Sequence, residues 1–391
     1  MSAEQLLADC VASTRVLGAD VYLVLAGGGN TSVKCILDGK EVMYIKGSGR
    51  DMAHVSREDF PALSLSALLA LRERKHLSDL AMLDSLRAAQ IDTTAPAPSV
   101  ESLVHAWLPY RFVDHSHSDT VLTVMASAES PQQAQDLCQK LFADAVEWLP
   151  FYASGFPLAQ ACAAAPTGLR GLLLKDHGIM AFGESAKECA ANHAWMVSRA
   201  EQYLQQHQAP TWNCETQTRA CPALDAATPF CWRSFSIDAQ FLKLPDAHIR
   251  ATSAALTPGH VLHVGPFPMW LDDDENLIGS IHSYRRDYQD WSQRYGSKCV
   301  KEDLMIPRTA IHGQSQTAFA AGFDFDHAEL AAEIFRHNLE AKLRGSALGP
   351  WYGASQEVVF AAENSTLERA KFARSTEESC AMVDKGIDRS V

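Results

Sequence analysis

Residues 112–117 read FVDHSH, and this stretch is the starting point for predicting the fold. Its apolar beginning predicts a β-strand, in which alternate side chains point to the same face. His115 and His117 therefore point the same way, roughly 6–7 Å apart at Cα. Two imidazoles at that separation are able to hold one divalent ion. An H-x-H pair by itself is a weak signal, and two ordinary histidines of the core or surface are the commoner explanation.

A third histidine lies in the run KDHG at residues 175–178, between the apolar runs 172–175 and 179–182. A polar Asp-His-Gly step between two buried strands needs partners, because buried polar groups are almost always satisfied. Asp and Gly are also common turn residues, so a simple turn is the alternative. Three histidine ligands would leave an open position on a zinc-like ion, which is the pattern of catalytic sites.

The run SVESLVH, which begins at Ser99, places Glu101 one helical turn before His105. Ser99 is predicted to cap a helix over residues 100–108. An acid in the first turn is favoured by the helix dipole, which is the ordinary explanation of Glu101. Glu101 is also a candidate general acid/base, able to move a proton on a carbon next to a metal-bound carbonyl.

Two glycine-containing loops are candidate anion sites. Residues 27–32 read GGGNTS, and residues 46–50 read KGSGR with two cations. Backbone amides in such loops bind anions, and Lys or Arg side chains strengthen the grip on a phosphate. Neither loop matches G-x-G-x-x-G and no Walker lysine follows, so dinucleotide binding is disfavoured. Each loop alone is also compatible with an ordinary turn.

The composition excludes several classes of function. A formal net charge of −13 argues against general nucleic-acid binding, which needs a basic surface. The chain has no run of eighteen apolar residues, and its N-terminal segment lacks the basic flank and apolar run of a signal peptide. We therefore expect a cytoplasmic protein without a membrane partner. None of the 10 cysteines forms a C-x-x-C pair, so reduced thiols are expected rather than a zinc ribbon.

The hydrophobic pattern predicts two α/β units. A polar linker at 208–229 separates residues 1–207 from a smaller unit at 230–375, and 376–391 form a polar tail. In the first unit, helices are expected over 4–18, 63–74, 100–108, from 131 onward and over 185–206, and strands over 21–27, 31–37, 42–45, 112–117, 121–124, 172–175 and 179–182. In the second, strands are expected over 261–264 and 304–306, an acidic turn over 272–275, and helices near 280–292 and 326–343.

Taken in order, these motifs resemble the class II aldolase/adducin family. The matching runs are GGGNTSVK (27–34), KGSG (46–49), PSVESLVHAWLP (98–109), DHSH (114–117) and KDHGIMAFG (175–183). Their order and spacing over roughly residues 1–207 are much more specific than any one motif. The residues of these motifs are most similar to those in the aldolase portion of fused rhamnulose-1-phosphate aldolase/alcohol dehydrogenase proteins. The fold that the resemblance implies is a three-layer α/β/α unit around a mostly antiparallel sheet.

The resemblance also implies roles for individual residues. The metal-binding histidines of the family correspond to His115, His117 and His177, and its catalytic glutamate corresponds to Glu101. Its substrate-phosphate positions correspond to Gly29, Asn30, Ser48, Gly49 and Ser99. A further phosphate position is often Ser in the single-domain fuculose-phosphate aldolases, but it is Val100 here, which removes one hydroxyl.

A metal-dependent carbon–carbon lyase is the function that the resemblance implies. It would cleave a ketose 1-phosphate or related sugar to a dihydroxyacetone phosphate-type enolate and an aldehyde. Zinc is the expected ion, with manganese or another divalent ion as the alternative, because imidazole suits several metals. A sugar phosphate is the expected partner, and a homo-oligomer, either a tetramer or a dimer, is the expected assembly.

Three other functions are compatible with the same scaffold. A phosphopentose 4-epimerase uses the same chemistry, but those enzymes carry Asp where this chain has Glu101. A decarboxylase or an isomerase-like relative is a second alternative. The third is a non-catalytic, adducin-like interaction protein, which would have no need of an open metal site. Metal content separates the enzymes from the interaction protein.

Parts of the second unit show a weak sequence similarity to the first. Residues 311–335 resemble residues 176–197 in layout. VLHVG at 261–265 resembles VDHSH, with Gly265 at the place of the second histidine. We hypothesise a degenerate second half of the aldolase type that has lost its metal site, with coincidence as the alternative. Halves without a shared strand topology would contradict this hypothesis.

Overall fold

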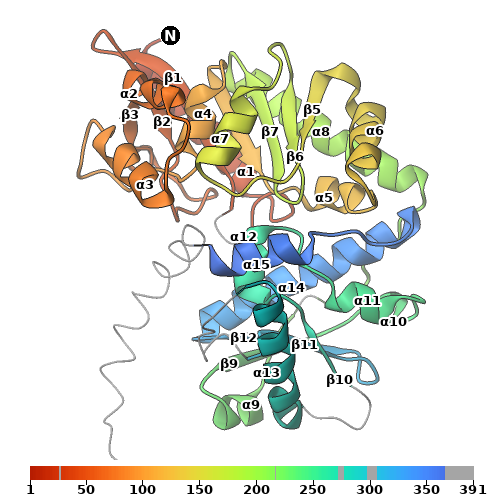
Figure 1. Ribbon diagram of the computed structural model, residues 1–391. Helices are drawn as coiled ribbons and strands as arrows, with labels where there is room; N and C mark the ends of the chain where they lie inside the picture. The colour runs from red at the N-terminus through yellow and green to blue at the C-terminus, as the bar shows by residue number, and fades with distance from the viewer. Residues whose placement is uncertain (26–27, 216, 272–276, 297–305, 366–391) are drawn as a thin grey trace, which may run out of the picture. The chain divides into compact units, whose positions relative to one another are not determined.

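The computed structural model describes residues 1–25, 28–215, 217–271, 277–296 and 306–365 (Figure 1). The chain divides into two compact units, Met1–Gln205 and Gln206–Val391. Each unit is built around a sheet of its own, which confirms the predicted pair of α/β units. Within the described ranges, no helix combines the length and the apolar character needed to cross a bilayer.

The first unit contains a seven-stranded sheet in the order β3-β2-β1-β4-β7-β6-β5. Neighbouring strands are antiparallel except for β5 and β6, so the predicted mostly antiparallel sheet is confirmed. The turn at Asp38 and Gly39 has positive φ at both residues and forms the predicted hairpin. The strands are β1 (Asn30–Leu37), β2 (Lys40–Ile45), β3 (Ala62–Ser64), β4 (Phe112–Ser116), β5 (Val146–Leu149), β6 (Gly171–Leu174) and β7 (Gly178–Gly183).

Two long helices cover one face of this sheet. Thr31, Asp114 and Ala181 are paired across β1, β4 and β7 and therefore share a face. Helix α1 meets that face where Thr14 Oγ1 lies 2.5 Å from Thr31 Oγ1. Helix α8 meets it where Cys189 Sγ lies 3.2 Å from the Ala181 carbonyl O. The two helices are α1 (Ala3–Gly18) and α8 (Ala186–Gln206).

Shorter helices cover the opposite face, on which His115 lies. His105 in α4 contacts Ser32 of β1, and Trp107 packs edge-on against Phe156 of α7 with ring centroids 5.5 Å apart. The unit therefore has the predicted three α/β/α layers. The shorter helices of the unit are α2 (Leu65–Ala70), α3 (Asp79–Ala88), α4 (Ser102–Trp107), α5 (Asp119–Met125), α6 (Pro131–Phe142) and α7 (Phe156–Ala163).

The second unit contains a five-stranded sheet in the order β10-β11-β12-β9-β8. Phe335 of α14 packs against Phe235 of β9, with ring centroids 6.0 Å apart. The strands are β8 (Arg219–Ala220), β9 (Cys231–Ser236), β10 (Met269–Leu271), β11 (Thr309–His312) and β12 (Thr317–Gly322). The helices are α9 (Pro222–Ala227), α10 (Ala239–Leu242), α11 (Ala247–Thr252), α12 (Pro258–Val264), α13 (Leu277–Arg294), α14 (Phe325–Gly345) and α15 (Gln356–Asn364).

Two predicted strands are helices. Residues 121–124 lie in α5, whose N-cap Ser118 accepts a hydrogen bond from the Val121 amide. Residues 261–264 lie in α12, which begins with Thr257 as N-cap and Pro258 at its first position. A short apolar run does not distinguish a buried strand from a buried helix, and the capping residue decides the outcome in both cases.

The strand predicted over 21–27 is also wrong where the structure describes it. Residues 21–23 form a turn after α1, in which the Leu23 and Val24 amides donate to the Asp20 carbonyl O. The segment still lies along the end of β4, because the His117 amide donates to the Leu23 carbonyl O at 2.9 Å. Residues 26–27 lie outside the described ranges.

Other predicted boundaries shift. Helix α4 begins at Ser102 rather than Val100, and Ser99 precedes it by three residues instead of capping it. The helix predicted over 63–74 is divided into β3, α2 and a 3₁₀ turn at Leu71–Glu73. The predicted linker contains β8 and α9. Three predicted features lie outside the described ranges: the acidic turn at 272–275, residues 304–305 of one strand and the tail at 376–391. The predicted domain limits at 207, 229 and 375 stay predictions.

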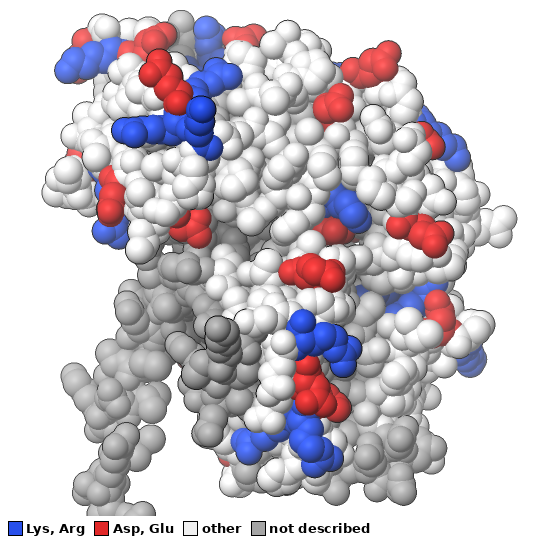
Figure 2. Space-filling view, viewed as in Figure 1, with Lys and Arg blue, Asp and Glu red and all other residues white. Residues whose placement is uncertain are grey.

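Charged side chains are dispersed on the visible face of the molecule. Figure 2 shows positive and negative groups interspersed over that face, without a broad basic surface. With a net charge of −13, this arrangement gives no support to nucleic-acid binding.

Candidate metal centre

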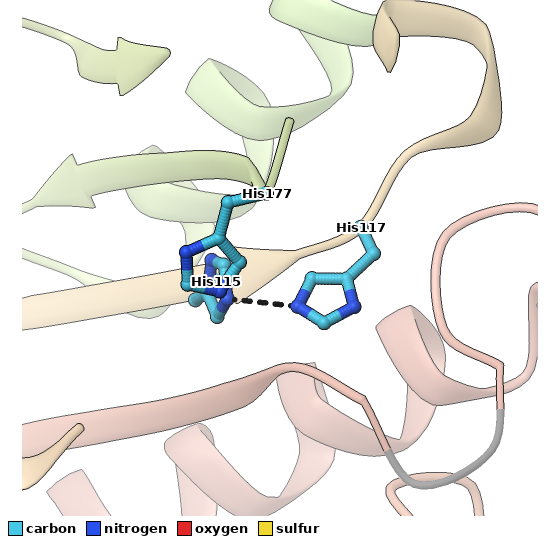
Figure 3. A group of neighbouring side chains, drawn as sticks. All are labelled: His115, His117 and His177. Carbon is cyan, nitrogen blue, oxygen red and sulfur yellow. Dashed lines mark hydrogen bonds between the residues drawn. The ribbon is translucent and has the colours of Figure 1, made fainter. Parts of the chain in front are cut away.

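Three histidines converge from two places in the first sheet (Figure 3). His115 lies in β4, His117 follows the end of that strand, and His177 lies directly before β7. Each ring offers one ligand atom, and these atoms all lie within 4.8 Å of one another. The ring centroids are 4.9, 4.9 and 5.3 Å apart. The structure thus brings together the residues predicted as metal ligands.

A hydrogen bond determines which nitrogen His115 offers. Its Nδ1 donates to the Ile179 carbonyl O at 2.9 Å, which places the lone pair of the neutral ring on Nε2. That Nε2 lies 3.1 Å from Nε2 of His117. Two nitrogens bound to one tetrahedral zinc ion at ~2.0–2.1 Å are about 3.3 Å apart. The pair therefore fits a shared ion with little rearrangement.

Glycines leave space for the imidazole rings. A β-carbon on Gly178 would lie 2.2 Å from the Ser116 carbonyl O and 3.2 Å from Cε1 of His115. A β-carbon on Gly28 would lie 2.8 Å from Nδ1 of His117. The sequence interpretation treated these glycines as turn or anion-loop residues and missed this role. The position of Gly178 directly after a candidate ligand was the available signal.

Glu101 places a buried carboxylate beside the histidines. Its Oε1 lies 3.1 Å from Nε2 of His177, and its Oε2 lies 3.6 Å from Nε2 of His115. Oε2 also accepts a 2.6 Å hydrogen bond from Asn30 Nδ2. This hydrogen bond fixes the orientation of the Glu101 carboxylate. The arrangement holds a proton-transfer group next to the candidate metal position.

Asn30 brings a second polar atom to the site. It pairs with His115 across β1 and β4, and Gly29 before it has a φ of 72°, which suits glycine. Asn30 Oδ1 is buried and, among the described residues, has no hydrogen-bond partner. Leaving a buried acceptor unpaired costs about 1–3 kcal/mol, so this atom is a candidate contact for a bound ligand.

His105 turns towards the sheet rather than towards the other histidines. Its Nδ1 lies 2.8 Å from Ser32 Oγ. Burial lowers the pKa of His105 to about 3, so its ring is neutral at neutral pH. This contact ties α4 to β1 and holds in place the helix that Glu101 precedes.

The candidate phosphate residues lie in adjoining loops. The Ser48 amide donates to the Ala97 carbonyl O at 2.8 Å, which places Ser48 and Gly49 beside the segment leading to Ser99. Gly49 has a φ of 72°, and a β-carbon added to it would meet nothing within 4 Å. Ser99 Oγ accepts a 3.2 Å hydrogen bond from the Glu101 amide. The Ser48 amide is therefore already paired with the protein's own backbone.

The opposite face of β4 carries a buried polar layer that the sequence interpretation missed. Ser116 Oγ lies 2.6 Å from His193 Nε2 of α8. Burial raises the pKa of the Asp114 carboxyl to about 6. Strand alternation was the available signal, since residues 114 and 116 must point away from the side on which His115 lies. This layer fixes the strand that presents the candidate ligands.

Three comparisons place the chain among known proteins. It is similar to the "Uncharacterized oxidoreductase YuxG" of Bacillus subtilis (strain 168), with 32% identity over 204 residues. The matched segment covers 50% of this chain and 29% of that protein. It therefore spans less than a third of that relative. It is also similar to the N-terminal class II aldolase domain of a conserved protein from Thermoplasma acidophilum, with 33% identity, a TM-score of 0.48, and coverage of 52% of this chain and 96% of that one.

A third likeness is to the L-fuculose-1-phosphate aldolase of Thermus thermophilus, at 20% identity and a TM-score of 0.36, over 52% of this chain and 97% of that one.

The family assignment rests on two family models. The class II aldolase and adducin N-terminal domain matches residues 9–204, and the second domain of class II aldolase matches residues 231–372. The chain therefore belongs to the class II aldolase and adducin family.

Proposed function

We propose that this protein is a metal-dependent class II aldolase that cleaves a ketose 1-phosphate or related sugar to dihydroxyacetone phosphate and an aldehyde. The convergence of three imidazoles, with the Glu101 carboxylate 3.1 Å from His177, supports this proposal most strongly. A three-histidine site that leaves an open position, next to a proton-transfer group, provides what such a cleavage needs.

His115, His117 and His177 would hold the ion. Zinc is the expected metal because three protein ligands and an open position are typical of catalytic zinc sites. Manganese or another divalent ion is the alternative, since imidazole binds several of them. When bound, the ion supplies Lewis-acid chemistry, taking up negative charge that develops on the carbonyl oxygen of the substrate.

The cleavage breaks the bond between carbons 3 and 4 of the sugar. The electron pair of that bond moves to carbon 3, and the oxygen on carbon 4 becomes the aldehyde oxygen. In sum, the proton lost from the carbon 4 hydroxyl is replaced by one gained at carbon 3. We assign the transfer at carbon 3 to Glu101, whose Oε2 is held by Asn30 at 2.6 Å while Oε1 faces the histidines.

The substrate phosphate and hydroxyls are assigned to the polar groups around Glu101. We propose phosphate contacts at Gly29, Asn30, Ser48, Gly49 and Ser99. The buried Oδ1 of Asn30 would accept a hydrogen bond from a substrate hydroxyl. Val100 offers no hydroxyl next to Ser99, so phosphate binding depends more heavily on the loop that contains Ser48. We further propose a homo-oligomer, a dimer or a tetramer, located in the cytoplasm.

A substrate panel tests the reaction class. Purified protein loaded with zinc or with manganese is incubated with ketose 1-phosphates of differing chirality, and dihydroxyacetone phosphate is measured with a coupled reductase. We expect cleavage of at least one ketose 1-phosphate, and loss of that cleavage in Glu101→Gln with the ion retained. Epimerised or decarboxylated products without dihydroxyacetone phosphate would replace the lyase by one of the related enzymes. A chain that binds no ion and converts no sugar would contradict the proposal.

A further inference from the structure

The second unit repeats the arrangement of half of the first. Along the chain, the first unit runs β4, α5, α6, β5, α7, β6, β7, α8, and the second runs β9, α10, α11, α12, β10, α13, β11, β12, α14 (Figure 1). The strand orders β4-β7-β6-β5 and β9-β12-β11-β10 correspond strand for strand. In both sheets the last pair is parallel and the other pairs are antiparallel. Only α11 lacks a counterpart among these elements.

The register of the strands also matches. Gly183 ends β7 opposite the first residue of β4, and Gly322 ends β12 opposite the first residue of β9. In the first sheet the Phe182 amide donates to the carbonyl O of Arg170 at 3.0 Å. In the second, the amide of Ala321 donates to the carbonyl O of Arg308 at 2.8 Å. Each bond joins the residue before the terminal glycine to the arginine before the neighbouring strand.

Two kinds of side chain are retained at matching places. Trp148 in β5 is paired with the third residue of β6, and Trp270 in β10 is paired with the third residue of β11. Each terminal glycine lies so close to the backbone of the helix that follows that no β-carbon would fit. A β-carbon on Gly183 would lie 2.5 Å from the Cys189 amide N, and one on Gly322 would lie 2.2 Å from the Ala328 amide N. A shared sheet order alone would not require these matches.

The same register identifies what replaces the candidate ligands. Counting from the strand starts, Ser234 and Ser236 occupy the places of the two histidines of the FVDHSH run. Gln316 precedes β12 as His177 precedes β7, although its loop is one residue longer. Thr317 occupies the place of Gly178, the glycine that gives the imidazoles room. All three ligand positions have therefore changed together with the glycine that accommodates them.

We infer that the described residues between 231 and 345 are a structural repeat of residues 112–206, in which the ligand positions of a former metal site now hold Ser234, Ser236 and Gln316. The inference about a metal rests on the proposed role of the histidines in the first unit. Glu101 and the glycine loops precede β4, outside the repeated part, so the second unit received no copy of them. On this account the described residues would hold one ion, at the histidines of the first unit, and the second sheet would supply only the backbone frame of a second site.

The repeat corrects the match expected from the sequence. The run VLHVG at 261–265 lies in and after α12, so it is not the counterpart of β4. The counterpart is β9, whose residues CWRSFS show no resemblance to FVDHSH. The other expected match holds, because residues 311–335 contain parts of β11 and α14 and all of β12, as residues 176–197 contain β7 and part of α8.

Rebuilding the site tests the inference. In the full chain, S234H, S236H, Q316H and T317G are combined, and Co²⁺ is titrated while its visible absorption and the bound equivalents are followed. We expect one more Co²⁺ per chain than in the unaltered protein, with the absorption of a low-coordinate nitrogen site. A matched variant with S234A, S236A, Q316A and T317G has the same relaxed backbone without ligands, and we expect it to bind no additional ion.

The ion counts separate this inference from the proposed function. If the unaltered protein binds no ion, the metal role of the first unit is contradicted. If the unaltered protein binds one ion and the rebuilt variant folds but gains no further ion, the repeat inference is overturned. If the rebuilt variant does not fold, the reciprocal variant with H115S, H117S and H177Q decides. Folding with a melting temperature near that of the unaltered, metal-free protein supports the repeat. Unfolding overturns it, because the second sheet folds with Ser, Ser and Gln at those places.

Discussion

Strands β4 and β9 occupy the same place in two sheets of matching order, but their surroundings differ. All five residues of β4 are buried, whereas only Trp232 and Phe235 are buried in β9. His115 is fully buried, while Ser234 and Ser236 are half-buried. This sheet framework therefore forms without histidines at these places. In the inferred repeat, the second copy has lost the three imidazoles and the small residue that leaves them room, and the carboxylate of the first copy comes from outside the repeat.

The largest expected effect comes from Glu101, which has no counterpart among the described residues of the second unit. Glu101→Gln keeps the shape of the side chain but removes its ability to exchange a proton. We expect sugar cleavage to fall by about 10²–10⁴-fold, with the ion content unchanged. Glu329→Gln, a half-exposed carboxylate in α14, serves as the control and should leave both unchanged. A cleavage rate within a few-fold of the original would remove Glu101 from the mechanism.

The next effect concerns the glycine that the second unit replaced with Thr317. In Gly178→Ala the new β-carbon would press on the Ser116 carbonyl O and on the His115 ring. We expect the ion to bind about 10–100-fold more weakly, as for other changes that disturb ligand orientation. Isothermal titration with Zn²⁺ measures this. Gly39→Ala serves as the control, because Gly39 lies in a hairpin turn where a β-carbon would meet no atom within 4 Å. An unchanged Zn²⁺ affinity in Gly39→Ala would show that the effect of Gly178→Ala is local and not a general loss of stability.

A third prediction tests the likeness of the two copies. Gly183→Ala and Gly322→Ala should destabilise the protein by similar amounts, about 1–3 kcal/mol each, because both overpack the start of a following helix. Chemical denaturation followed by circular dichroism gives the two values. A large cost for one substitution and none for the other would mean that the glycines do not occupy equivalent places.

The smallest effect is a pH dependence of the second unit. Burial lowers the pKa of His260 to about 3, below that of an exposed histidine in the unfolded chain. Between these values the unfolded state binds the extra proton, so stability decreases as the pH falls below about 6.5. From pH 7 to pH 5.5, we expect the unaltered protein to lose about 1 kcal/mol more than His260→Gln. Equal losses in thermal denaturation at both pH values would contradict a buried, neutral His260.

Much of the first unit could be predicted from the sequence because its signals are local. The alternation in FVDHSH places His115 in a strand, and Asp38-Gly39 indicates a hairpin, since each depends on neighbouring residues alone. Residues 121–124 and 261–264 were predicted as strands because a short apolar run is compatible with either structure, and the capping contacts of Ser118 and Thr257 decided for a helix.

The contacts that complete the site are not local, so the sequence could not provide them. The bond from Asn30 to Glu101 joins residues 71 positions apart, and that from His105 to Ser32 joins residues 73 apart. Both depend on the packing of α4 over β1. The counterpart of β4 was also out of reach, because β9 keeps its place in the sheet but not its residues.

Metal analysis of the purified protein beside His117→Ala tests the central claim most directly, with His312→Ala in the second unit as the matched control. We expect one ion per chain in the unaltered protein and in His312→Ala, and none in His117→Ala while its circular dichroism is unchanged. Absence of an ion from all three proteins, even after incubation with zinc and manganese, would contradict the metal centre and the aldolase mechanism built on it.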